Sequence, residues 1–377
     1  MIESMLRDKL IPFWGKLIDR ENGGYYGYVD FDLNTDKNAV KGVILNSRIL
    51  WFFSNAKETE YAEHAYKFLT RNCMDIENGG VYWSLNADGT PADTTKHCYN
   101  QAFAIYALAA YYELTGDRNA LRHAYDLFSV IETKCADPDG YGEAYDRKWN
   151  PAGNEKLSEN GVEAKRTMNT LLHVFEAYSG LYQADKDPKV AEKMRKILEI
   201  FKDKVFNPEL ERQEVFFDED YNSLIDLQSY GHDIEASWLI DWGTSLLGDK
   251  ALTAEIGEIT KKLAANVYNL AYHDSSLWNE RDRGEENKSR IWWVQAEAVL
   301  GFFNQYQKTG DWKYLNAVRE ILTYIDEKLV DKRDGSEWFW ELDENGEPTS
   351  RKPIVEPWKC PYHNGRMIFE LLERGYE

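Results

Sequence analysis

Residues 97–117 read HCYNQAFAIYALAAYYELTGD, and this stretch decides the fold. Apolar residues recur along it at the spacing of one helix face, namely Ala102, Ile105, Tyr106, Ala109 and Tyr112. Gly116 and Asp117 then end that helix and begin another, because glycine favours the conformation that follows a helix and aspartate caps the next one. The stretch therefore predicts one helix over 97–115, joined by a tight turn to a second.

The same Gly-Asp joint recurs at Gly248-Asp249 and at Gly310-Asp311, each time between two stretches of helical period. Three such joints indicate stacked antiparallel helix pairs. A short element rich in glycine and aromatic residues also recurs six times, about 55 to 75 residues apart, which leaves room for two helices per repeat. The six elements are Gly23–Tyr26, Gly79–Trp83, Gly140–Gly142, Val215–Phe217, Ser276–Trp278 and Gly335–Trp340.

Six helix pairs with no alternating strand runs predict an all-α protein, and specifically a closed (α/α)6 barrel with short aromatic β-hairpins at its mouth. We expect one catalytic domain over residues 1–377, because no linker or low-complexity tract divides the chain. An open helical solenoid is the alternative architecture. Aromatic side chains at a barrel mouth suit sugars, whose apolar C–H faces they cover.

Charge and composition restrict the partners of the chain. Among its 377 residues, 45 lysines and arginines face 65 aspartates and glutamates, a formal net charge of −20. Such a charge repels nucleic acids and anionic membrane surfaces. The mixed charges of residues 1–9 and the lack of a long apolar run predict a cytoplasmic protein without a membrane span. Four scattered cysteines, Cys73, Cys98, Cys135 and Cys360, predict free thiols.

Three histidines stand in unusual surroundings. His232 follows Gly231 at an expected helix start, where the helix dipole favours the neutral imidazole, and Glu235 lies three residues on, where it can orient the ring or bind a hydroxyl. His173 follows Asn169 by four residues in an apolar helix. His363 lies where a turn enters the final helix. A lone helical histidine is usually a packed core residue, so position alone does not assign a function.

Two charged residues interrupt apolar runs. Arg48 lies in Asn46–Trp51 and Glu297 in Arg290–Val299, both within expected inner helices. A buried charge must be paired or serve a ligand. Several polar residues of this kind on inner helices favour a ligand site over packing.

These residues resemble the N-acylglucosamine 2-epimerase superfamily over about Arg48 to Arg366. The motifs that carry the resemblance are Asn46-Ser47-Arg48, Trp51–Ser54, Tyr99–Ala104, Asn169 with His173, Gly231–Ala236, Trp292–Glu297 and Pro361–Arg366. The resemblance implies an (α/α)6 barrel that reversibly converts the reducing-end glucose of β-1,4-linked disaccharides, such as cellobiose and lactose, to mannose. A small disaccharide is thus the expected partner, and we expect a monomer.

The resemblance further implies the roles of the site residues. His232 and His363 would exchange the C2 proton on opposite faces of the sugar through an enediolate, a task that suits the near-neutral pKa of histidine. Arg48 would stabilise the oxyanion, and His173 would open the ring or bind its oxygens. The expected substrate-binding residues are Tyr99, Asn169, Glu235, Trp293, Glu297 and Trp358. No cofactor and no metal is expected.

Several alternatives remain open from sequence. A mannose isomerase or an N-acylglucosamine 2-epimerase of the same superfamily shares the bases and differs in the product. A glycoside hydrolase on the same barrel needs two carboxylates that flank the bond. A non-catalytic sugar-binding protein and a metal-dependent isomerase are further possibilities.

Overall fold

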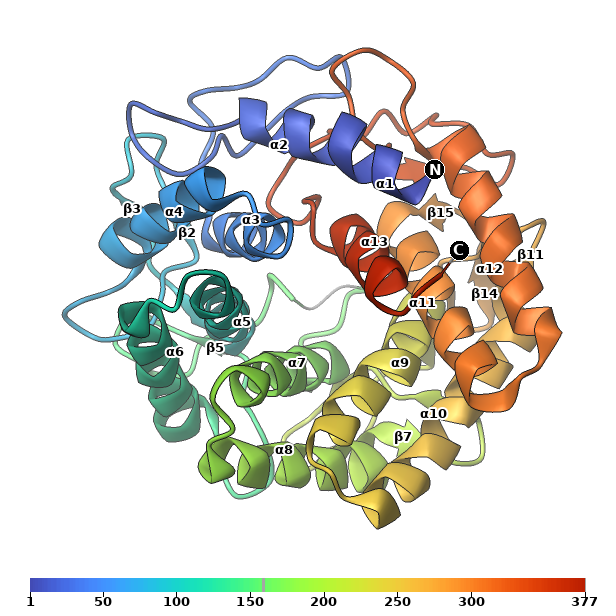
Figure 1. Ribbon diagram of the computed structural model, residues 1–377. Coiled ribbons are helices and arrows are strands. Elements are labelled where there is room, and N and C mark those ends of the chain that lie inside the picture. Colours follow the sequence, from blue (N-terminus) through green and yellow to red (C-terminus); the bar gives the residue numbers. More distant parts are fainter. Residues whose placement is uncertain (158–159, 377) are drawn as a thin grey trace.

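Twelve helical segments form two concentric rings among residues 1–157 and 160–376, which the computed structural model describes (Figure 1). The inner ring consists of α3 (Val43–Asn55), α5 (Cys98–Thr115), α7 (Met168–Asp185), α9 (Tyr230–Leu246), α11 (Trp292–Thr309) and α13 (His363–Glu373). The outer ring consists of α1 (Ile2–Ser4) continuing into α2 (Ile11–Lys16), then α4 (Thr59–Phe68), α6 (Arg118–Val130), α8 (Pro188–Ile200), α10 (Lys250–Ala271) and α12 (Trp312–Tyr324). The predicted all-α barrel with six helix pairs is confirmed.

Five of the outer segments include a π-helical turn. These turns are Met5–Leu10 between α1 and α2, and Leu69–Cys73, Ile131–Cys135, Phe201–Val205 and Ile325–Leu329 at the ends of α4, α6, α8 and α12.

Within the described part of the chain, no helix is both long and apolar enough to cross a membrane.

The predicted Gly-Asp joints connect inner to outer helices. Gly116 ends α5 in the left-handed conformation with φ 72°, and the Asp117 side chain accepts a hydrogen bond from the Asn119 backbone N–H at the start of α6. Asp249 and Asp311 cap α10 and α12 in the same way.

Inner helices are more deeply buried than one apolar face implies. Every residue of α5 from Cys98 to Tyr111 is buried, because the helix packs on an outer helix, on both inner neighbours and toward the barrel axis. Outer helices show the expected amphipathic pattern, as in α6, where Ala120, Ala124 and Leu127 face inward.

Short strands link each repeat to the next at one end of the barrel. Two three-stranded sheets join β1 (Lys41–Gly42), β2 (Ser84–Leu85) and β3 (Pro91–Asp93), and β10 (Leu227–Ser229), β13 (Glu280–Asp282) and β14 (Glu285–Asn287). The remaining antiparallel pairs are β4 (Lys96–His97) with β5 (Ala144–Tyr145), β6 (Arg166–Thr167) with β9 (Phe216–Phe217), β7 (Phe206–Asn207) with β8 (Arg212–Gln213), β11 (Tyr272–His273) with β12 (Ser276–Leu277), and β15 (Arg290–Ile291) with β16 (Glu341–Leu342).

The ring is closed rather than open. Val29 near the start of the chain forms a bridge with Val355 near its end, with the Val29 N–H donating to the Val355 carbonyl at 3.0 Å. α13 also packs against α3 and α11. The last repeat therefore contacts the first, which excludes the open solenoid.

The aromatic hairpins differ in part from the prediction. Tyr25, Tyr141 and Trp338 from three of the six elements are buried and pack structure instead of lining the mouth. In the fourth repeat the hairpin is formed by β7 and β8, whereas Phe216 and Phe217 pair with β6 of the preceding repeat. All four cysteines are free and buried.

Candidate active site

A cavity of about 340 Å³ opens at the end of the barrel where the inner helices begin. The first two turns of all six inner helices contribute to its wall, so several helix N-termini point toward one space. Nine of the ten predicted site residues line it, namely Arg48, Tyr99, Asn169, His173, His232, Glu235, Trp293, Trp358 and His363. Their convergence from six helices and, for Trp358, from the loop before α13 makes this the candidate active site.

Trp293 contacts both imidazoles of the predicted pair. Its ring centroid lies 4.8 Å from that of His232 and 5.3 Å from that of His363. Gly231 makes this arrangement possible, because a Cβ at position 231 would lie 2.4 Å from the Trp293 ring. His232 and His363 therefore line one cavity beside a shared indole.

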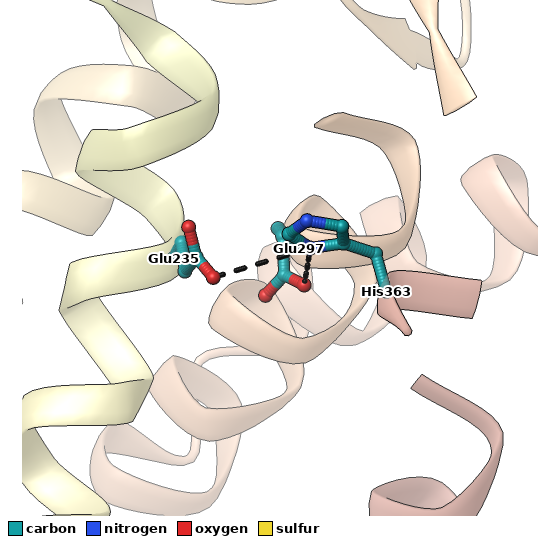
Figure 2. Close-up of side chains that lie close together, drawn as sticks. All are labelled: Glu235, Glu297 and His363. Atoms are coloured by element: carbon teal, nitrogen blue, oxygen red, sulfur yellow. Dashed lines mark hydrogen bonds and ion pairs between the residues drawn. The ribbon is translucent and has the colours of Figure 1, made fainter. Parts of the chain in front are cut away.

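His363 is held from behind by Glu297. Its Nδ1 lies 2.7 Å from Oε1 of Glu297, and Figure 2 shows the carboxylate close beneath the ring. Glu297 itself is fully buried and does not line the cavity. Its position differs from the expected substrate contact: the carboxylate faces the histidine rather than the sugar space.

His173 has an equivalent partner in Glu176. The Nδ1 of His173 lies 2.8 Å from Oε2 of Glu176, three residues along α7. Because a carboxylate only accepts hydrogen bonds, Nδ1 of both His173 and His363 carries a proton. Their Nε2 atoms are therefore the ring nitrogens left for a ligand.

His232 does not pair with Glu235, which corrects the expected orienting contact. Its Nδ1 lies 2.7 Å from Oγ of Ser229, the residue before α9. A side chain in the first turn of a helix leans toward the N-terminus, which brings it to Ser229 rather than to Glu235. A serine hydroxyl can donate or accept, so this contact permits either tautomer of His232.

Glu235 instead contacts Arg366, with its Oε1 accepting a hydrogen bond from the guanidinium, and lies 4.0 Å from Nδ1 of His363 (Figure 2). Its Oε2 accepts no hydrogen bond from the described residues, and Glu235 lines the cavity. Asn169 also lies in the cavity wall, and its Oδ1 likewise accepts no hydrogen bond from the residues that the structure describes. Both atoms are suited to accept hydrogen bonds from ligand hydroxyls.

Arg48 is a buried cation at the cavity wall. It donates a hydrogen bond to the Tyr99 hydroxyl at 2.9 Å, and its guanidinium lies 4.1 Å from the Phe103 ring centroid. No carboxylate forms an ion pair with it among the residues that the structure describes. Such a cation favours a ligand that is negatively charged or becomes so during reaction.

The electrostatics keep the histidine pair neutral in the free protein. Burial lowers the pKa of His232 to about 3, assisted by His173. Burial, followed by the charges of Arg366 and Arg48, also lowers the pKa of His363 well below its usual value. In contrast, burial and the neighbouring Glu297 raise the pKa of Glu235 to about 7. Neutral imidazoles are the form that removes a proton from carbon.

Glu235, Glu297 and His363 form a cluster of potential metal ligands. One ligand atom from each lies within 4.8 Å of the others. However, the Arg366 guanidinium donates hydrogen bonds to Oε1 of both carboxylates. A cationic side chain thus already occupies the position between these acids, so the donor set does not fit a metal ion.

Three residues that hold the site were not among those predicted: Glu176, Ser229 and Arg366. A signal for Glu176 existed, because it lies three residues after His173, the same spacing that drew attention to Glu235. Arg366 stands three residues after His363 in the same way. Ser229 has no distinctive pattern around it.

Comparison with known proteins identifies similar chains. The family model described as N-acylglucosamine 2-epimerase matches residues 24–364. A cellobiose 2-epimerase of Ruminococcus albus (strain ATCC 27210) is 50% identical over 100% of this chain and 98% of its own. One of Dictyoglomus turgidum is 47% identical over 98% and 96%. A solved sugar epimerase from a ruminal bacterium superposes with a TM-score of 0.98 at 49% identity, covering 100% of this chain and 98% of that one.

Proposed function

The chain belongs to the N-acylglucosamine 2-epimerase family, and we propose that it interconverts glucose and mannose at the reducing end of β-1,4-linked disaccharides such as cellobiose and lactose. Relatives that are 47–50% identical over almost their whole length are cellobiose 2-epimerases, which supports this substrate class. The proposed reaction is an isomerisation that inverts the configuration at one carbon and leaves the other bonds of the sugar as they were.

One observation carries the mechanism: two imidazoles contact the same indole within one cavity. Inversion at C2 requires a base on one face of the carbon and an acid on the other. His232 and His363 are our candidates for these two groups. The neutral form of each ring in the free protein allows either to act as the base.

The proton balance of this reaction involves solvent. The ring of the sugar opens to the aldehyde, and one imidazole takes the C2 proton to give an imidazolium and an enediolate. The second imidazole, protonated from solvent and stabilised by the enediolate charge, delivers a proton to the opposite face. The first imidazolium then releases its proton, so no net proton is gained or lost.

Arg48 and the inner-helix N-termini are suited to stabilise the enediolate. The guanidinium is buried at the cavity wall, where the low dielectric strengthens its interaction with negative charge. The N-termini of several inner helices contribute further positive potential there. Both effects favour the charged intermediate over the neutral sugar.

His173 and the remaining wall residues are assigned to binding and ring opening. The Nε2 of His173 is available to an oxygen at C1 or C2, because Nδ1 is bound to Glu176. Asn169 and Glu235 offer acceptor oxygens, and Trp293 and Trp358 offer flat faces. Cofactor independence stays a prediction, consistent with a chemistry that needs only proton transfer.

Incubation of the protein with cellobiose in D2O tests this function. We expect a product with mannose at the reducing end, one deuterium at C2 and no increase in reducing ends. A ketose product would instead indicate an isomerase, and an increase in reducing ends would indicate a hydrolase. If the protein bound cellobiose but did not convert it, the result would indicate a non-catalytic sugar-binding protein. An epimer without deuterium at C2 would contradict proton transfer.

A further inference from the structure

Arg366 lies at the centre of a buried charge cluster behind the cavity. It belongs to α13, and only 1% of its surface is exposed. Its guanidinium donates hydrogen bonds to Glu176, to Glu235 and, at 2.6 Å, to Glu297. Each carboxylate comes from a different inner helix, α7, α9 or α11. One side chain thus connects four of the six inner helices.

Two of these carboxylates hold catalytic candidates. Glu176 binds Nδ1 of His173, and Glu297 binds Nδ1 of His363. Neither acid lines the cavity, and neither does Arg366, whereas both histidines do. Two chains of contacts therefore start from Arg366, and each runs from the guanidinium to a carboxylate, to an imidazole and then to the cavity.

The shape of the guanidinium matters as much as its charge. Nη1 donates to Oε1 of Glu176 and Nη2 to Oε1 of both Glu235 and Glu297, while the rings of Tyr362 and Trp238 lie 4.3 Å and 4.9 Å from its carbon. A planar fork serves several acceptors at fixed angles, whereas a lysine ammonium is a single point of charge. The fork fixes where the two histidine-binding carboxylates lie.

We propose that Arg366 is a positioning residue for both His173 and His363. By holding Glu176 and Glu297, it keeps Nδ1 of each imidazole as the hydrogen-bond donor and presents each Nε2 to the sugar. The effect on rate rests on the proposed function, but the effect on the tautomers does not. A merely structural role would neutralise buried carboxylates without setting the protonated nitrogen.

The substitution Arg366→Lys separates these two roles, because it retains a positive charge and removes the fork. In ¹⁵N-histidine NMR spectra, the parent protein is expected to show both His173 and His363 as Nδ1–H tautomers. In R366K we expect at least one of them to become a mixture of tautomers. We also expect kcat on cellobiose to fall about tenfold to a hundredfold, the loss known for residues that orient metal-bound histidines, with KM changed less than about threefold.

Arg374→Lys is the matched control. Arg374 directly follows the last residue of α13, pairs with Glu370 at 2.9 Å and places its guanidinium 5.5 Å from the same Trp238 ring, but it contacts neither histidine-binding carboxylate. We expect unchanged tautomers and kcat in this variant. Arg366→Met, which removes the charge, should shift the acid limb of the kcat profile to higher pH, since the Arg366 charge no longer opposes the imidazolium at His363.

Wild-type tautomers in R366K, together with a kcat within about twofold of the parent, would overturn the proposal. If R366M fails to fold, R366K still decides, since it keeps the charge that the carboxylates need. A parent protein that does not epimerise cellobiose would contradict the proposed function alone, because the tautomer comparison is read without turnover.

Discussion

The Nδ1 atom of His363 lies 2.7 Å from Oε1 of Glu297, a residue on a different inner helix and fully buried beneath the cavity floor. The carboxylate accepts three hydrogen bonds in all, from His363, from Trp238 at 2.9 Å and from Arg366. This arrangement fixes the ring orientation of His363 and leaves its Nε2 free for the ligand. In the proposed reaction, Glu297 would therefore act through His363 rather than through contact with the sugar.

Glu297→Gln should lower kcat on cellobiose by roughly 10²- to 10⁴-fold, the range seen when the acid partner of a catalytic histidine is neutralised. An amide can turn its NH₂ group toward Nδ1 and thereby favour the wrong tautomer. Initial rates with product analysis measure the loss. Glu370→Gln, on α13 and outside the cavity wall, is the control. Full activity in E297Q would show that the contact does not matter.

Replacing one imidazole at a time should reveal which face each histidine serves. His232→Ala and His363→Ala are both expected to lose epimerisation by at least about 10²-fold. Each variant should still exchange deuterium from D2O into C2 of one epimer only, because the remaining imidazole can remove and return a proton on its own face. NMR of the recovered sugars measures the exchange. If both variants labelled the same epimer, opposite faces would be ruled out.

Gly231→Ala should disturb the indole that both histidines contact. The new Cβ would lie 2.4 Å from the Trp293 ring and 2.7 Å from the Val294 side chain, so the indole must move. We expect kcat to fall about tenfold or more, and stability to fall by about 1–3 kcal/mol, as overpacking does. Gly257→Ala in α10 is the control, since its nearest neighbour would be 3.8 Å away. Steady-state kinetics and thermal unfolding measure both effects.

The repeat could be read from sequence because its signals are local. The Gly116-Asp117 joint needs only a left-handed glycine and a capping aspartate, both of which act within one turn. The prediction of a hairpin at 215–217 is wrong because these residues pair with a distant strand: Phe216 pairs with Thr167 and Phe217 with Arg166. Nothing near Phe216 indicates that partner.

The site residues were identifiable, but their contacts were not. Spacing places Glu235 and His232 on one helix face, yet it does not say which of several neighbours Glu235 will bind. Its actual partner, Arg366, lies 131 residues later and reaches it only because the ring closes. Glu297 lies behind His363 because α11 packs against α13, 66 residues apart in the sequence. Contacts between side chains of different inner helices therefore cannot be predicted from the spacing of residues in the sequence.

Asp233 gives a pH dependence of stability that is separate from catalysis. It accepts hydrogen bonds from the Gln213 backbone N–H at 2.9 Å and from the Gln228 side chain at 3.1 Å, but burial dominates and raises its pKa to about 7. A carboxyl whose pKa is raised on folding binds a proton that the unfolded chain releases. Its stabilisation is present at acidic pH and is lost as the pH rises through about 7.

Asp233→Asn should therefore flatten the decline of stability between about pH 4 and about pH 7. The amide keeps an acceptor oxygen for the Gln213 N–H but carries no titrating proton. A shift of about three pKa units corresponds to at most about 4 kcal/mol, of which about 2 kcal/mol falls between pH 5.5 and pH 7, so urea unfolding at pH 5.5 and pH 8.5 should resolve the difference between variant and parent. Asp220→Asn, in an exposed loop, should follow the parent at both pH values. If the stabilities of D233N and the parent changed equally between the two pH values, Asp233 would already be ionised in the folded protein. The hydrogen bonds from Gln213 and Gln228 would then stabilise its charge.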